Sequence, residues 1–166
     1  MLRLTLPIAT LFAPALLGAA PVPQAAARRF DAIAFFSGRT EGTGRIKIVL
    51  RGAEPIRVEG RGRMDGDTLV LDQAVTAGTN PPKPRQWRIR QVAAGRYTGT
   101  LTDAKGAVTG ETIGNRLHLS FTTKSGFRVD QWLTLAPDGR SAENKLTARR
   151  FGFTVATLDE TIRKLD

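Results

Sequence analysis

Short segments of alternating apolar and polar residues run through most of this chain, and glycine-containing turns separate them. The turns read MDGD (64–67), AAG (93–95), AKG (104–106), KSG (124–126) and PDG (137–139). Glycine supplies the left-handed backbone of a tight hairpin, and a period of two is typical of a half-buried strand. The pattern predicts an all-β antiparallel sandwich or barrel. The strands expected are Thr40–Leu50, Ile56–Met64, Thr68–Thr76, Arg85–Val92, Arg96–Asp103, Ala107–Gly114, Arg116–Thr123, Phe127–Ala136 and Ser141–Phe151.

Two segments depart from the alternation. Residues 77–84 read AGTNPPKP, which predicts an irregular loop. Residues 154–165 read TVATLDETIRKL, and a helical period would group four apolar residues on one face: Val155, Leu158, Ile162 and Leu165. We therefore expect a short amphipathic C-terminal α-helix that covers the barrel, with membrane association as the alternative.

The first predicted hairpin has one basic face and one face of apolar residues and glycines. With a loop at residues 51–55, Leu50 would lie opposite Ile56, and Arg45 would lie opposite Arg61. Two arginines opposite each other are unfavourable unless solvent or an anion lies between them. The basic face is expected to point outward, either as a solvated surface or as a site for anions. The residues expected to contact anions are Arg45, Lys47, Arg61 and Arg63.

Two later hairpins predict the interior of the barrel. Pairing across turn 93–95 places Ile89 opposite Gly99 and Trp87 opposite Leu101. Glycine inside a strand indicates tight curvature, close packing against rings, or a cavity. If there is a cavity, the residues expected to line it are Trp87, Ile89, Tyr97, Gly99, Leu117, Leu119 and Phe121.

The only histidine and a nearby serine and aspartate are the one set that resembles a catalytic triad. Across the turn at 124–126, His118 lies opposite Trp132 and Ser120 lies opposite Asp130, all on the outer side. A serine two residues from a histidine on one strand face points parallel to it, so we expect a polar cluster rather than a triad. The C-terminal helix or residues 30–36 would cover the outward tryptophan.

Two carboxylates could lie together near the barrel mouth. Asp103 and Glu111 flank the turn at 104–106, which could direct both inward. Inner carboxylates can orient a polar ligand group, but they more often cap a turn or pair with an arginine. With one histidine and no cysteine, neither a zinc site nor thiol catalysis is expected, and no cofactor motif is present.

The first 27 residues have the pattern of a secretory signal peptide. Arg3 precedes an apolar run from Leu4 to Leu17, and small residues follow, so cleavage is expected after Ala19 or Ala27. Residues 28–166 would then form a single β-barrel domain in the periplasm or outside the cell. The chain has a formal net charge of +10, which favours anionic partners such as a phospholipid or lipopolysaccharide surface. The basic hairpin lacks stacking aromatics, which argues against nucleic acid.

Several short motifs recur in an order and spacing that resemble a known family. They are FFSG (35–38), GTG (42–44), RQWRI (85–89), GRYTG (95–99), DQWLTL (130–135), Asn144 and FG (151–152). This pattern resembles an uncharacterised proteobacterial envelope family, the domain of unknown function DUF3833, many of whose members are described as lipoproteins. The resemblance implies a lipocalin-like (calycin-like) up-and-down barrel, here of about nine strands, with no established activity. This chain lacks the lipoprotein cysteine, and Gln131 stands where the family usually has a second acid.

These observations together predict a non-enzymatic, exported binding protein. The barrel would hold an apolar or amphipathic, lipid-like small molecule and turn its basic face to an anionic envelope surface. The alternatives are a structural envelope protein that contacts a partner through Trp132 and the C-terminal helix, and an enzyme. The enzyme would use Asp103 with Glu111, or Asp130 with His118.

Overall fold

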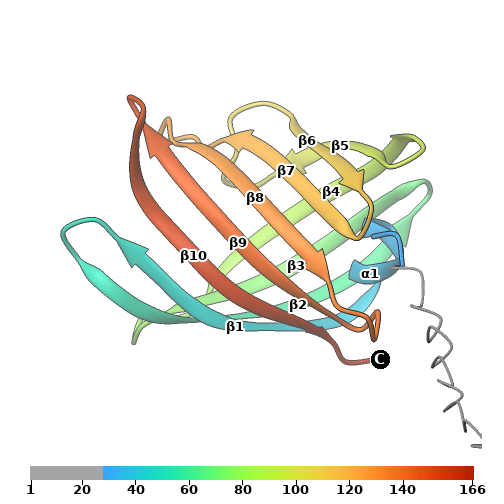
Figure 1. Ribbon diagram of the computed structural model, residues 1–166, viewed down its shortest axis with the longest axis horizontal. Helices are drawn as coiled ribbons and strands as arrows, with labels where there is room; N and C mark the ends of the chain where they lie inside the picture. Colours follow the sequence, from blue (N-terminus) through green and yellow to red (C-terminus); the bar gives the residue numbers. More distant parts are fainter. Residues whose placement is uncertain (1–27) are drawn as a thin grey trace, which may run out of the picture.

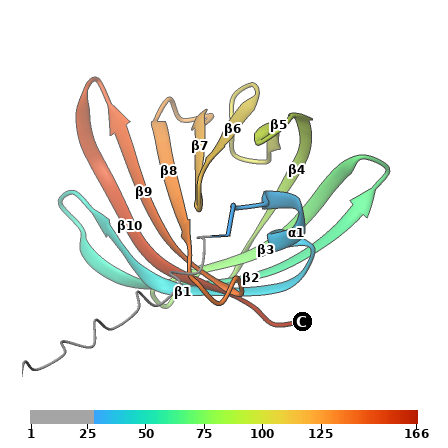
Figure 2. The same cartoon turned by 45° about the vertical axis from the view of Figure 1, so that its right-hand side comes forward.

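The computed structural model describes residues 28–166, and these form one closed antiparallel barrel of ten strands. Each strand pairs with its neighbours in the sequence, and the last strand pairs with the first, so the barrel is of the up-and-down kind (Figures 1 and 2). Closure leaves no sheet edge unpaired. The strands are β1 (Gly38–Ile48), β2 (Gly52–Asp65), β3 (Thr68–Ala77), β4 (Lys83–Ala93), β5 (Arg96–Leu101), β6 (Val108–Ile113), β7 (Arg116–Thr122), β8 (Arg128–Leu135), β9 (Ser141–Arg150) and β10 (Phe153–Lys164).

The nine predicted strands are confirmed in position, but the predicted C-terminal helix is wrong. That segment is β10, which pairs with β9 on one side and with β1 on the other. Its inward positions include Leu158, Glu160 and Ile162, all buried, while Asp159 and Thr161 point outward. A charged residue at an inward position hides the period of two, so the segment resembles an amphipathic helix. The barrel consequently has ten strands and not nine.

The predicted register of the first hairpin is also wrong. Gly44, and not Leu50, lies opposite Ile56, because the strands continue to a tight turn at residues 49–51 and residues 52–55 belong to β2. Arg45 therefore lies opposite Pro55 and not opposite Arg61. The shift is an even number of residues, so each side chain keeps its predicted face. The prediction failed because Glu54 and Pro55 resemble loop residues.

The registers predicted for two other hairpins are confirmed. Ile89 lies opposite Gly99, and His118 lies opposite Trp132. In both hairpins the apolar set points into the barrel: Trp87, Ile89, Tyr97, Leu117, Leu119 and Phe121 are all buried. Short turns fix the register, which is why these pairings follow from the sequence.

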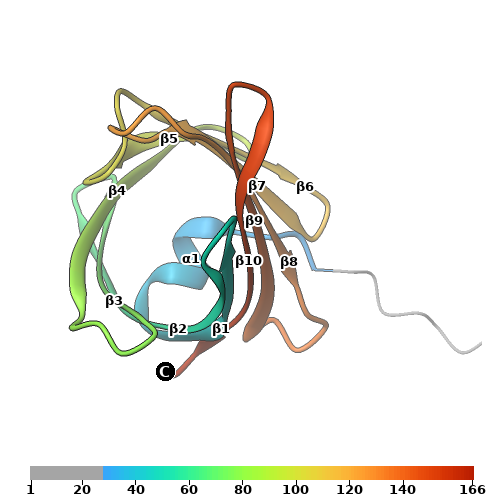
Figure 3. The ribbon, with the colours of Figure 1, turned by 90° about the vertical axis from the view of Figure 1, so that its left-hand side faces the viewer.

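Residues 30–36, which we call the plug, lie inside one end of the barrel. They include the only helix of residues 28–166, α1 (Ala32–Phe36), which Figure 3 shows within the ring of strands. Asp31 caps this helix by accepting a hydrogen bond from the N–H of Ala34 at 3.0 Å. The plug is tied to the wall because the Thr112 hydroxyl donates to the carbonyl of Phe30 at 3.0 Å.

Two glycines on β2 make room, one for the plug and one for a side chain of β1. A Cβ at Gly62 would overlap the backbone carbonyl of Phe36, and one at Gly60 would overlap the hydroxyl of Thr40. The glycine-rich inner face predicted for the first hairpin therefore accommodates neighbouring groups at these positions.

The predicted signal peptide, residues 1–27, lies outside the residues that the structure describes. Within residues 28–166, no helix is both long enough and apolar enough to cross a membrane.

Candidate functional site

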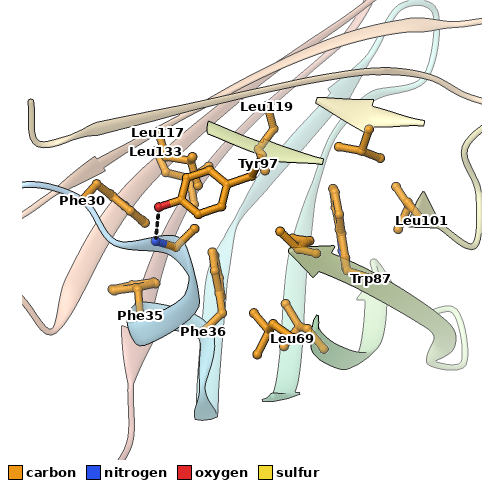
Figure 4. Packing of buried hydrophobic residues seen from close by; sticks show 14 of the residues in the cluster. Phe30, Phe35, Phe36, Leu69, Trp87, Tyr97, Leu101, Leu117, Leu119 and Leu133 are labelled. Carbon is orange, nitrogen blue, oxygen red and sulfur yellow. Dashed lines mark hydrogen bonds between the residues drawn. The ribbon is translucent and has the colours of Figure 1, made fainter. Parts of the chain in front are cut away.

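The plug and its neighbours fill one half of the barrel interior. The rings of Phe30 and Phe35 pack 5.2 Å apart, and those of Phe35 and Phe36 pack edge to face at 5.0 Å. Figure 4 shows these rings against Tyr97, Leu117 and Leu133. This half of the barrel is a packed core.

The residues predicted to line a ligand cavity divide between this core and a cavity beyond it. Trp87, Ile89 and Leu119 line the cavity. Tyr97 and Leu117 are buried in the core beside the plug. Phe121 is buried nearer the turn at residues 123–127, where its ring meets that of Trp87 edge to face at 5.6 Å. At Gly99, a Cβ would overlap the backbone carbonyl of Arg88, so this glycine permits a close approach of β4 and β5.

The cavity lies inside the barrel and has a volume of about 50 Å³. Since a water molecule needs roughly 10–15 Å³ of such space, the cavity suits a few waters or a small polar group. Its apolar lining includes Phe36, Ile56, Val58, Leu71, Leu146, Leu158 and Ile162, and its polar lining consists of Gln73, Arg85, Gln131, Asn144 and Glu160.

A buried carboxyl–amide pair forms the polar part of the cavity wall. Asn144 on β9 and Glu160 on β10 lie directly opposite each other, and both are more than nine-tenths buried, with relative exposures of 2% and 7%. The side-chain N–H of Asn144 donates to Glu160 Oε2 at 2.7 Å. The two remaining oxygens, Asn144 Oδ1 and Glu160 Oε1, have no hydrogen-bond partner in the described residues. Buried polar atoms without a partner are uncommon and point to a missing one.

Burial raises the pKa of the Glu160 carboxyl above the ordinary glutamate value. The hydrogen bond from Asn144 and the positive charge of Arg85 act in the opposite direction but are weaker. The environment therefore favours the neutral carboxyl or a donor that compensates its charge.

Gly42 provides the space that Glu160 occupies. A Cβ at Gly42 on β1 would overlap Glu160 Oε1. In the observed conformation the carboxyl occupies the space that the missing side chain at this position leaves free.

Two further polar contacts lie around the cavity. The indole N–H of Trp87 donates to Gln73 Oε1 at 2.9 Å, which fixes the ring in the cavity wall. Arg85 donates from Nε to Asp103 at 3.1 Å. Asp103 therefore pairs with an arginine, as the sequence favoured. The alternative in which Asp103 and Glu111 lie together inside the barrel is wrong, because Glu111 is exposed on the outer face of β6, opposite His118.

The lumen beyond the cavity has apolar walls that are only half-buried. These inward residues are Ile46, Ile48, Val58, Val75, Leu146, Ala148 and Ala156. The chain reverses near them at residues 49–51, 78–82, 102–107, 123–127 and 151–152, which form the end of the barrel opposite the plug. We call this end the mouth. The half-exposed apolar walls show that the lumen is reached from the mouth and not from the plugged end.

The four residues predicted to contact anions lie on the outer wall. Arg45 and Lys47 are exposed, and Arg61 lies directly opposite Arg39. Arg63 forms an ion pair with Asp72. A shallow groove of about 580 Å³ near Arg39 and Arg61 is also lined by acidic residues, so this wall is not uniformly basic.

The predicted outer cluster of His118, Ser120 and Asp130 is present on the wall. His118 Nε2 lies 3.3 Å from Asp130, whereas no hydrogen bond joins Ser120 to His118 in the part of the chain that is described. The expected cover over Trp132 is wrong: neither a helix nor the plug lies there. Instead the indole stacks on His118 at 4.3 Å, and the Arg116 guanidinium lies 4.2 Å from its centroid.

Sequence reasoning missed Glu160 and gave Asn144 no role. The signal was present, because Leu158, Glu160 and Ile162 alternate with polar residues at a period of two. Interpreting the segment as a helix placed Glu160 on a solvent face.

Within residues 28–166, no group of three or more histidine, cysteine or carboxylate side chains could hold a metal ion.

Comparison with known proteins identifies a family but no activity. The model of the family described as "Protein of unknown function (DUF3833)" matches residues 22–164, so the chain belongs to that family. No curated protein matches the chain.

Proposed function

We propose that this DUF3833 barrel is a non-enzymatic, lipocalin-like binding protein that holds one small amphipathic molecule, with the polar end of that molecule at Asn144 and Glu160. The observation that carries the proposal is the buried pair itself, with two acceptor oxygens that have no protein partner in the described residues. Such a pair destabilises an apolar interior unless another group satisfies it.

The chemistry of the pair selects the ligand. Asn144 Oδ1 is an acceptor, and Glu160 Oε1 is an acceptor when the carboxyl is ionised, so the ligand that stabilises the ionised pair must present hydrogen-bond donors, as an ammonium or hydroxyl group does. A carboxylate ligand would instead be repelled by Glu160. An ammonium group on the ligand has a further advantage over a hydroxyl, because its positive charge compensates the negative charge of Glu160 in a poorly solvated place.

The shape of the lumen supports an elongated ligand. The cavity of about 50 Å³ accepts a head group but not a long chain. The chain would extend toward the mouth along the half-buried apolar walls, including Ile46, Val58 and Leu146. The proposal includes export to the periplasm or the medium, which the signal-like pattern of residues 1–27 supports.

The test uses three probes with the same chain and different ends: decylamine, decanol and decanoate. A Trp132→Phe background leaves Trp87, in the cavity wall, as the fluorescent reporter. Decylamine and decanol should change its emission at concentrations at least about tenfold lower than decanoate, because an unpaired buried acceptor or like charge costs this much. Glu160→Gln should abolish this preference.

The matched control is Glu111→Gln, the same change on the outer wall. It should leave all three titrations unchanged. Equal binding of the three probes, stronger binding of decanoate, or no binding of any would contradict the proposal.

A further inference from the structure

Two neighbouring hairpins at the mouth expose apolar tips. β1 and β10 pair as far as Ile48 opposite Ala156, and the N–H of Val49 then donates to the carbonyl of Val155 at 3.0 Å. Beyond this point, the β1–β2 and β9–β10 hairpins extend from the same end of the barrel, as Figures 1 and 3 show. The three most exposed large apolar side chains of residues 28–166 lie there: Leu50 is fully exposed, and Phe151 and Phe153 are 86% and 76% exposed.

The backbone at these tips is unfavourable for the residues that occupy it. Leu50 has φ of 70° and Phe151 has φ of 50°, and within residues 28–166 they are the only non-glycine residues with positive φ. Phe151 and Gly152 form the two-residue turn between Arg150 and Phe153, a position where Asn or Gly is usual. Each tip is therefore unfavourable both in backbone conformation and in solvation. A residue that is kept although both its backbone conformation and its exposure to water are unfavourable indicates a functional constraint on its side chain.

Basic side chains surround the aromatic tip. A groove of about 390 Å³ beside Phe151 is lined by Arg128, Arg149 and Arg150 and contains no acidic residue. Arg128 lies directly opposite Arg149 on adjacent strands, an arrangement that repels unless an anion lies between the two. Arg149 also contacts Asp130 at 3.1 Å, which compensates one of the three charges.

We propose that the mouth docks on a bilayer that contains anionic phospholipid. Leu50, Phe151 and Phe153 enter the interface between head groups and acyl chains, and a lipid phosphate occupies the groove formed by the three arginines. Apolar side chains combined with neighbouring basic residues are the features of proteins that bind such interfaces.

The test is co-sedimentation of the full chain with phosphatidylcholine vesicles that contain or lack phosphatidylglycerol. The wild-type chain should sediment only with the anionic vesicles, and added salt should weaken binding. The double variant Leu50→Asn with Phe151→Asn should lower the partition coefficient by about tenfold or more, because two apolar side chains leave the interface. Asparagine tolerates positive φ, so this variant keeps the fold.

Controls separate the mouth from other surfaces. Ile113→Thr removes an exposed apolar residue at the plugged end and should have no effect. Arg128→Gln with Arg150→Gln should weaken binding by about fivefold for each charge. Arg61→Gln with Arg90→Gln removes two exposed charges toward the plugged end and should not weaken binding. Phe153→Trp should give a blue-shifted emission on anionic vesicles.

The proposal would be overturned by any of three results. They are a wild-type chain that ignores anionic vesicles, a double variant that binds as well as wild type, and a protein dimer in solution that the double variant abolishes. Glu160→Gln should leave vesicle binding unchanged, so failure of this proposal is distinguishable from failure of the proposed ligand site.

Discussion

The hydroxyl of Tyr97 accepts a hydrogen bond from the backbone N–H of Ala32 at 3.4 Å, and thereby joins the barrel wall to the first turn of α1 (Figure 4). Tyr97 is buried on β5, and Ala32 lies 65 residues earlier in the chain. The single tyrosine thus contributes to closing one end of the barrel, where the sequence suggested a ligand contact.

Removing this hydroxyl should loosen the plug without creating a cavity. Tyr97→Phe should lower the free energy of unfolding by about 1 kcal/mol, the usual effect of losing one hydrogen bond. Tyr97→Ala should cost about 3 kcal/mol or more, because the ring is lost as well. Urea unfolding measures both. Equal stability of wild type and Tyr97→Phe would show that the contact contributes nothing.

The raised pKa of Glu160 predicts a pH-dependent difference between wild type and Glu160→Gln. The folded state holds the proton more tightly than the unfolded state, so wild type loses stability as pH rises from the ordinary glutamate pKa through the raised value. The amide does not titrate. Glu160→Gln should therefore be more stable than wild type at neutral pH, and the difference should shrink in acid. Melting temperatures across this pH range test the sign, and a constant difference would contradict it.

Gly62 and Gly60 should differ in their tolerance of alanine. A Cβ at Gly62 meets the backbone of the plug, which cannot move without displacing α1, whereas one at Gly60 meets the side chain of Thr40, which can rotate. Gly62→Ala should cost about 3 kcal/mol, at the upper end of the range for overpacking, and Gly60→Ala should cost less. Denaturant titration of the two variants gives the comparison, and the reverse order would refute it.

Phe151→Asn should stabilise the folded protein. Asparagine suits the left-handed position, and the side chain that it replaces is 86% exposed and contributes little to the core. We expect a gain of up to about 1 kcal/mol in the free energy of unfolding. Phe153→Asn is the matched control, because Phe153 is similarly exposed but lacks positive φ. Loss of stability in Phe151→Asn would show that the aromatic ring stabilises the turn.

The parts of the fold that follow from the sequence are those set by local chemistry. The glycine turns and the alternation placed nine strands, and they gave the pairings of Ile89 with Gly99 and of His118 with Trp132. The first hairpin failed at Pro55, which lies in a strand despite resembling a loop residue. Tyr97 and Leu117 were expected to line a cavity but pack beside the plug, since the sequence of residues 30–36 does not say which surface these residues cover.

The side on which each residue of the nine predicted segments lies follows from local sequence alone, because side-chain direction along a strand has a period of two whatever the strand pairs with. That residues 153–164 form the closing strand follows only from the three-dimensional fold, since their partner β1 lies more than a hundred residues earlier. The fold also brings the carboxyl of Glu160 on β10 into the space that Gly42 on β1 leaves free. Burial of a charged group depends on what approaches it from distant parts of the chain, and no local pattern records that.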